Sequence, residues 1–320
     1  VPLGLFVVAS TNPSGWSLVG LLFYWAFGLS LLHRSNWRNR RTWLIAMATV
    51  VTGVMAAGSR VDAAAYVVLA SALVLILAGP SRWRRAWAST AIVVAVTLFA
   101  GITFLVQGTP AGEAETMGSA SRGVGLLLTN AVYLPVLLQQ AVGGGALGWN
   151  DTVMPPLVGI VGVLALGAVA YCGLIVMTRR KAVAAVVAGV ALVAIPLAFL
   201  QKEGLGVGEV VQPRYLLPLM ALLIVVLSLG PRVGVPIPMN RIPAVALAAG
   251  LSVSAVLAYW ANAHRYFAGG AFGLFDLKVD PAWLSVTGVP LWLTTLMTAA
   301  ASVVFVSGVL VFMRPPALRG

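Results

Sequence analysis

Apolar residues occur along this chain in long runs, and short polar segments between the runs hold most of the charges. An unpaired peptide group is costly in hydrocarbon, so apolar runs that cross a bilayer are expected to be α-helices. The nine predicted spans are approximately Trp16–Leu32, Thr42–Ala57, Ala63–Ala78, Ser89–Val106, Pro156–Met177, Val183–Leu200, Tyr215–Leu229, Ile242–Trp260 and Leu291–Phe312. The pattern therefore predicts an all-α fold, a polytopic transmembrane helical bundle.

The first apolar run, Val1–Ala9, is shorter than the others. A helix needs about 20 residues to cross the hydrocarbon core, and this run lacks the basic segment with which a signal peptide begins. We therefore expect a partial first span, the end of a span whose beginning lies upstream. On this expectation residues 1–320 are a single transmembrane domain and the C-terminal fragment of a longer protein.

The segments between the spans alternate in charge. One set has no acidic residue and carries fourteen of the 20 Lys and Arg, in the runs His33–Arg41, Arg82–Arg85, Arg179–Lys181, Arg232–Arg241 and Arg314–Arg319. The other set holds all 8 acidic residues: Asp62, Glu113, Glu115, Asp151, Glu203, Glu209, Asp276 and Asp280. Because the positive-inside rule places basic loops in the cytoplasm, the C-terminus is predicted to be cytoplasmic and the carboxylates to lie on the outer face.

Composition narrows the class of protein further. A chain that is 60% hydrophobic and 9% charged is not a soluble globular domain. The net charge of +12 lies in short loops beside the spans, so topology explains it and no nucleic-acid partner is expected. The excess of Arg over Lys, with abundant Ala, Val and Gly, is typical of a GC-rich bacterial genome. The expected location is a bacterial plasma membrane, with the lipid bilayer as a partner.

Two predicted outer loops, 107–154 and 261–290, are longer than connectors need to be. Within the first loop, Gly123–Val142 is apolar but is interrupted by Asn130, Pro135 and the pair Gln139-Gln140. If this stretch crossed the membrane, every later basic run would face outward. We therefore predict that it forms an interfacial or re-entrant outer helix.

The strongest candidate for ligand binding is the segment from Gln212 to Tyr215. An arginine at the outer mouth of a span, such as Arg214, can donate two hydrogen bonds to a phosphate. Tyr215 adds a hydroxyl at headgroup depth. The alternative is that Arg214 extends to lipid phosphates and Tyr215 is only an interfacial anchor. The spacing of these residues leaves both interpretations open.

Two carboxylates are further candidates. Asp151 could act as a base or metal ligand, but its position before two prolines favours a turn or a helix cap. Ser59 followed by Asp62 fits a capping arrangement at the third span, which is the favoured interpretation of this pair. Arg60 either balances the charge of Asp62 or contributes a second cation to an outer phosphate pocket. Residues Thr11–Gly15 have the composition of a turn, in which Ser14 is able to cap the first full span.

Other types of site receive little support from the sequence. The two histidines, His33 and His264, have no second ligand residue at the spacing of a zinc site. The predicted spans contain no Asp, Glu, Lys or Arg, which disfavours a proton-coupled pump.

Four motifs, taken in order, resemble the bacterial membrane proteins of domain-of-unknown-function family 2142. These motifs are Asn12-Pro13-Ser14-Gly15, Ser59-Arg60 with Asp62, Gly148-Trp149 with Asp151-Thr152 and Pro155, and Gln212 with Arg214-Tyr215 and Pro218. They extend over roughly the first two thirds of the chain. The chain departs from the usual pattern of the family at Pro213, where glycine is usual, and at Asn150, where an apolar residue is common.

The resemblance implies kinship with type C glycosyltransferases, which use a polyprenyl-phosphate-linked sugar at the outer face. On this hypothesis Arg214 holds the donor phosphate, Tyr215 lies beside it and Arg60 is a second cation. Asp151 is the catalytic candidate, orienting a polysaccharide or glycolipid acceptor or bracing the pocket, while Asp62 and Gln212 join the substrate-binding residues. In that class a carboxylate of the first outer loop supplies the main base or metal contact, and here it would lie upstream of Val1. A divalent metal therefore stays open as a cofactor.

Two other functions stay open at this point. A transporter or flippase of lipid-linked saccharides needs a polar path across the bilayer, which the charge-free spans disfavour. A non-catalytic scaffold subunit is compatible with a catalytic loop that lies outside the chain.

Overall fold

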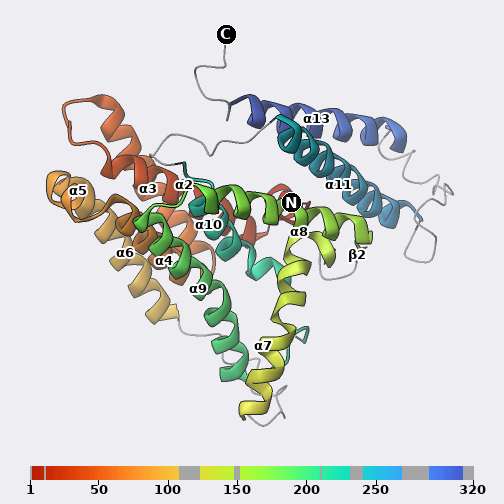
Figure 1. Ribbon diagram of the computed structural model, residues 1–320, viewed down its shortest axis with the longest axis horizontal. Helices are drawn as coiled ribbons and strands as arrows, with labels where there is room; N and C mark the ends of the chain where they lie inside the picture. Colours follow the sequence, from red (N-terminus) through yellow and green to blue (C-terminus); the bar gives the residue numbers. More distant parts are fainter. Residues whose placement is uncertain are drawn as a thin grey trace. The chain divides into compact units, whose positions relative to one another are not determined.

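The computed structural model describes residues 2–10, 12–107, 123–147, 152–209, 211–230, 241–268 and 288–312. The helices are α1 (Pro2–Ala9), α2 (Pro13–Leu32), α3 (Arg40–Ser59), α4 (Val61–Ala78), α5 (Pro80–Arg85), α6 (Trp87–Gln107), α7 (Val124–Gln139), α8 (Pro156–Ile175), α9 (Arg179–Glu203), α10 (Leu217–Leu227), α11 (Arg241–Ala268) and α13 (Leu291–Phe312) (Figure 1). Shorter elements are the π-helix η1 (Gln140–Gly144), the 3₁₀ turn η2 (Pro213–Tyr215) and the strands β1 (Ala146–Leu147) and β2 (Thr152–Val153).

The all-α, polytopic character of the chain is confirmed. In the described ranges, 8 helices are long and apolar enough to cross a membrane. Seven of them correspond to predicted spans, whereas α10 and the apolar part of α13, Trp292–Gly308, are shorter. The eighth is Val124–Gly144, the stretch predicted to be interfacial or re-entrant. Its length and composition therefore do not distinguish it from a span, and its position at the interface stays a prediction.

The second predicted outer loop begins later than expected. Helix α11 continues through Ala268, so that 261–268 is helical. Ala261 and Ala263 are buried on this extension. The polar residues after Trp260 therefore mark the end of the apolar stretch but not the end of the helix.

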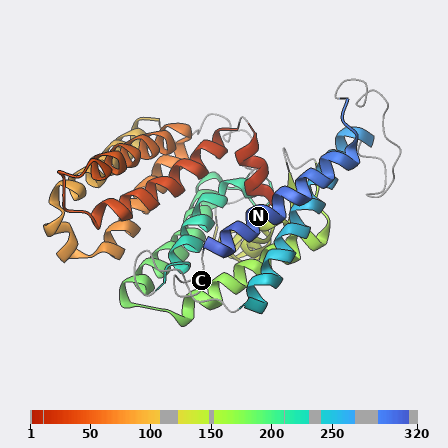
Figure 2. The ribbon, with the colours of Figure 1, turned by 90° about the horizontal axis from the view of Figure 1, so that it is seen from above.

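The chain forms two compact units, which are described separately. Unit 1 comprises Val1–Phe6, Val136–Val176 and Ser228–Gly320, and unit 2 comprises Val7–Pro135 and Met177–Leu227. In unit 2 the helices α2, α3, α4 and α6 pack side by side (Figure 2), and α9 and α10 also contact α4.

Small residues allow the close packing of α2 against α3. A Cβ atom at Gly20 would lie 3.0 Å from the backbone nitrogen of Ala56, and one at Gly53 would lie 2.9 Å from the ring of Tyr24. Helix pairs in membranes commonly associate through such small residues, because the surrounding lipid is as apolar as the side chains. The hydroxyl of Tyr24 is 2.6 Å from that of Ser71 and joins α2 to α4.

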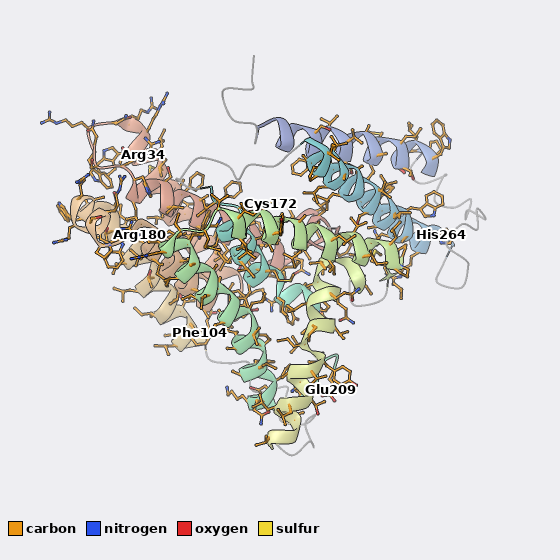
Figure 3. All side chains as sticks on the ribbon, in the orientation of Figure 1. Arg34, Phe104, Cys172, Arg180, Glu209 and His264 are labelled. Atoms are coloured by element: carbon orange, nitrogen blue, oxygen red, sulfur yellow. The ribbon has the colours of Figure 1, made fainter. Side chains whose placement is uncertain are left out.

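Unit 2 has two chemically different ends. At one end the Ser89 hydroxyl donates to the Arg34 carbonyl (3.3 Å), and Arg180 Nη1 donates to the Ala78 carbonyl (2.8 Å). These contacts bring three of the basic runs to the same end, where Figure 3 shows both Arg34 and Arg180. Helix α2 has 20 residues, so its N-terminus at Pro13 lies about 30 Å from this end. The predicted grouping of basic runs thus holds in unit 2, and the side that faces the cytoplasm stays a prediction.

In unit 1 the helices α8, α11 and α13 pack together. Helix α8 approaches η1 closely, and a Cβ atom at Gly159 would lie only 2.5 Å from the Cα atom of Gly144. Strands β1 and β2 pair antiparallel, with Leu147 opposite Thr152. Strand β2 also contacts α11, which places Thr152 beside the end of that helix.

Candidate functional site

Three of the sequence motifs meet at the end of unit 2 that lies opposite the basic runs. The start of α2 contributes Ser14, the junction of α3 and α4 contributes Arg60 and Asp62, and η2 contributes Arg214 and Tyr215. We call these five residues the arginine–tyrosine cluster. The cluster unites residues up to 201 positions apart in sequence, which follows from the packing of α2, α4 and α10 against one another.

Arg60 contacts three other residues of the cluster. Its Nε and Nη2 atoms donate to the two carboxylate oxygens of Asp62 (2.8 and 3.3 Å), and its Nη1 atom donates to the Ser14 hydroxyl (3.1 Å). The guanidinium carbon lies 4.2 Å from the centroid of the Tyr215 ring, which is a cation–π distance. Burial lowers the pKa of Arg60, but the hydrogen bond and the charge of Asp62 outweigh this effect, so that the pKa lies above its usual value. The guanidinium is therefore always charged.

The two predicted caps near this cluster are wrong. Helix α3 continues through Ser59, whose hydroxyl donates to the Ala56 carbonyl within the helix, so it does not cap α4. Arg60 holds the N-cap position without a side-chain cap, and Asp62 binds Arg60 instead, as the charge-balance alternative predicted. Helix α2 is capped by Asn12, whose Oδ1 accepts from the Ser14 backbone nitrogen (2.9 Å). This arrangement leaves the Ser14 hydroxyl to accept from Arg60.

Arg214 enters the cluster from a short 3₁₀ turn. Pro213 occupies the first position of this turn, where its fixed φ angle suits the helical backbone. The Arg214 side chain is only 8% exposed, and its guanidinium carbon is 5.5 Å from the centroid of the Tyr215 ring. The Tyr66 hydroxyl donates to the Tyr215 carbonyl (3.3 Å) and attaches the turn to α4. Protein atoms therefore cover most of Arg214, and whether it meets a specific ligand or lipid phosphates stays a prediction.

Gln212 stands just before the turn, in an extended backbone conformation (φ −82°, ψ 144°). Its amide oxygen is buried, and in the part of the chain that the structure describes it accepts no hydrogen bond. An unsatisfied buried acceptor is costly, and a ligand hydroxyl beside the turn would satisfy it.

Sequence reasoning missed one residue that positions the segment after α9. Asn130 of α7 is 1% exposed, its Nδ2 donates to the Leu205 carbonyl (2.8 Å), and its Oδ1 accepts from the Val207 backbone nitrogen (2.9 Å). These bonds fasten the segment that follows α9, where Gly204 has the left-handed conformation (φ 70°). The only signal in the sequence was a polar residue within an apolar run, which indicated an interruption and not a contact.

Asp151, the predicted catalytic residue, lies outside the described residues, as do Gly148, Trp149 and Asn150. The adjacent Thr152 lies in unit 1, where its hydroxyl accepts from Arg265 Nη1 (3.0 Å). The two long segments that were predicted to be outer loops therefore meet at this point. Helix α8 has Pro155 at its N-cap position and no side-chain cap there, and the turn or cap expected of Asp151 lies outside the described residues.

The described residues do not group into a metal site. Across the ranges that the structure describes, no cluster of three or more His, Cys, Asp or Glu side chains could hold a metal ion. The arginine–tyrosine cluster instead presents two guanidinium groups around one aromatic ring, with one carboxylate. This chemistry suits the recognition of an anion such as a phosphate.

The fold and the cluster define a polytopic helical membrane protein with a cationic, aromatic site where several spans end. The chain belongs to the predicted membrane protein family DUF2142, whose sequence model matches residues 1–223. This match includes all five residues of the cluster and Asp151. No curated protein and no solved structure matches the chain.

Proposed function

We propose that the protein is a polyprenyl-phosphate-sugar-dependent, glycosyltransferase-like membrane protein of cell-envelope polysaccharide or glycolipid assembly. The observation that carries the proposal is the placement of two guanidinium groups around the Tyr215 ring, where the helices α2, α3, α4 and α10 end. A lipid-linked phosphate has its tail in the hydrocarbon and its charge at the interface. A cation site at the ends of spans meets that charge at the right depth.

In this proposal Arg214 binds the donor phosphate. Its planar guanidinium can donate two parallel hydrogen bonds to phosphate oxygens, and its burial reduces the competition from water. Gln212, whose amide oxygen is buried beside the turn, accepts from a hydroxyl of the sugar.

Arg60 has a different role from the second cation that residue types suggested. Its charge is balanced by the two hydrogen bonds to Asp62, so it adds little net positive charge. It instead holds the Tyr215 ring through the cation–π contact and so orients the turn that carries Arg214. Asp62 and Ser14 in turn fix the position of the Arg60 side chain.

The remaining parts of the proposal concern the acceptor and the membrane. We place Asp151 at the acceptor, which it orients from the segment that precedes Thr152. We place the protein in a bacterial plasma membrane, with the cluster on the outer face and the C-terminus in the cytoplasm, because the basic runs flank the opposite ends of the spans.

The test measures how much undecaprenyl phosphate binds to the full chain in detergent or nanodiscs, with native mass spectrometry as the readout. Arg214→Ala should weaken binding at least about tenfold, because a charge-assisted hydrogen bond contributes roughly 1.5–3 kcal/mol. Arg214→Lys should bind at an intermediate level, since an ammonium lacks the planar fork. The matched control is Arg179→Ala, an exposed arginine at the start of α9, which should bind like the parent protein.

Equal binding by Arg214→Ala and the parent protein would contradict the assignment of Arg214. If the parent protein also fails to bind undecaprenyl phosphate above phosphatidylcholine, the proposed donor is wrong. Transfer of labelled sugar from a polyprenyl-phosphate donor, lost in Arg214→Ala membranes and kept in Arg179→Ala membranes, distinguishes an enzyme from a flippase or a scaffold.

A further inference from the structure

The basic end of unit 2 carries seven arginines in two segments. The loop between α2 and α3, with the first turn of α3, holds Arg34, Arg38, Arg40 and Arg41, and α5 holds Arg82, Arg84 and Arg85. The hydrogen bond from Ser89 at the start of α6 to the Arg34 carbonyl keeps the two segments together. We call these seven residues the basic end.

None of these seven guanidinium groups has a hydrogen bond or ion pair within the portion of the protein that the structure describes. Two other arginines of unit 2, Arg60 and Arg180, do have partners within the protein. Arg60 is bound by Asp62 and Ser14, and Arg180 donates to the Ala78 carbonyl while its guanidinium packs on Gly79. The basic end also has no acidic residue in either of its sequence segments. Among the described residues, no carboxylate balances its charge.

Tryptophans accompany the arginines at the same depth. The Trp37 and Trp43 rings pack edge to face, with centroids 5.1 Å apart, and the Trp43 indole nitrogen donates to the Trp37 carbonyl (2.9 Å). The Trp43 side chain is nevertheless 56% exposed and that of Trp87 is 73% exposed. Exposed indoles at the ends of apolar helices are typical of the membrane–water interface, where the ring meets lipid and the N–H group meets polar neighbours.

We propose that the basic end binds the headgroups of anionic phospholipids. The two observations needed for this are independent: unpaired guanidinium groups supply the donors for phosphate oxygens, and the exposed indoles place those donors at headgroup depth. In Figure 3 the side chains around Arg34 extend away from the helices, as headgroup contacts require. A soluble polyanion would also satisfy the arginines, and its binding is one outcome of the test below.

The test measures which phospholipids stay bound to the full chain. The protein is reconstituted in nanodiscs of equal parts phosphatidylglycerol and phosphatidylcholine and then analysed by native mass spectrometry for retained lipid. The parent protein should retain phosphatidylglycerol preferentially. The triple variant Arg82→Gln/Arg84→Gln/Arg85→Gln should lose this preference by about tenfold or more, since each basic residue near an anionic surface contributes to binding.

Two further variants separate charge from folding and from the other site. The triple Lys variant at the same positions keeps the charge and should keep most of the preference. Arg38→Gln/Arg40→Gln/Arg41→Gln, on the other segment, should lose it as the first triple variant does. Arg214→Ala should retain phosphatidylglycerol like the parent protein, so the result is independent of the proposed donor site.

Equal retention of phosphatidylglycerol and phosphatidylcholine by the parent protein would overturn the proposal. So would an unchanged preference in both triple Gln variants. Displacement of the lipid by a short soluble polyphosphate at equal phosphate concentration would also overturn it, because that outcome identifies a general polyanion surface.

Discussion

The two ends of unit 2 use the same residue type in opposite ways. At the basic end, seven arginines have no described partner within the protein, and they surround exposed tryptophans. At the other end, Arg60 and Arg214 converge on the Tyr215 ring, and Arg60 is bound by a carboxylate and a hydroxyl. The comparison shows that positive charge alone does not identify a site. The partners that hold each side chain decide whether an arginine marks a membrane surface or a specific pocket.

The comparison makes a prediction about stability. Substitutions at the end of unit 2 that carries the arginine–tyrosine cluster should lower the free energy of unfolding more than matched substitutions at the basic end. The largest effect is expected for Asn130→Ala. It leaves the Leu205 carbonyl and the Val207 backbone nitrogen without their buried partner, which should lower the free energy of unfolding by about 2–3 kcal/mol. Thermal unfolding in detergent measures the change. A loss under about 0.5 kcal/mol would show that the segment after α9 is held by other contacts.

The second effect is expected for Arg60→Met, which keeps the length of the side chain and removes its donors. Asp62 and Ser14 lose their partner, and the Tyr215 ring loses its cation–π contact. Because the pair is partly exposed, with side-chain exposures of 25% and 33%, we expect a loss of about 1–2 kcal/mol. Undecaprenyl phosphate binding should also weaken.

A double-mutant cycle with Arg214→Ala sharpens this result. If Arg60 acts on Arg214 through Tyr215, the Arg60→Met effect on binding should shrink in an Arg214→Ala background. Fully additive effects on binding would show that Arg60 contacts the ligand independently.

The third effect is expected for Asn39→Ala at the basic end, which is the matched partner of Asn130→Ala. Asn39 caps α3 through a bond from the Arg41 backbone nitrogen (2.9 Å), and this end of the helix is exposed to solvent. Loss of such a cap should cost about 1 kcal/mol, since water replaces the missing acceptor. If Asn39→Ala and Asn130→Ala lower the free energy of unfolding equally, the predicted difference between the two ends is wrong.

The smallest effect is expected for Arg84→Gln. This exposed side chain has no protein partner among the described residues. The free energy of unfolding should therefore change by no more than about 0.5 kcal/mol. Its only measurable effect should be on retained phosphatidylglycerol. A larger change in unfolding would reveal a contact of this guanidinium with the rest of the protein.

Sequence reasoning succeeded where the signal is periodic or cumulative. Apolar runs located the long helices, and the alternation of charge grouped the basic runs that unit 2 places at one end. It failed where two local interpretations compete for one side chain. Ser59 and Asp62 have the spacing of a cap, but α3 continues through Ser59, and a cap requires an extended residue at that point.

The separation of charged ends and apolar spans is therefore a property of this sequence by itself, because the cost of placing charge or unpaired peptide groups in hydrocarbon acts on each segment independently. Only the tertiary structure decides which residues form the arginine–tyrosine cluster. Ser14, Arg60 and Tyr215 come from segments far apart in the chain. The close packing of α2 on α3 through Gly20 and Gly53, and the packing of α10 against α2 and α4, bring them together. Distances of that kind depend on how helices interlock, which no local pattern of residues encodes.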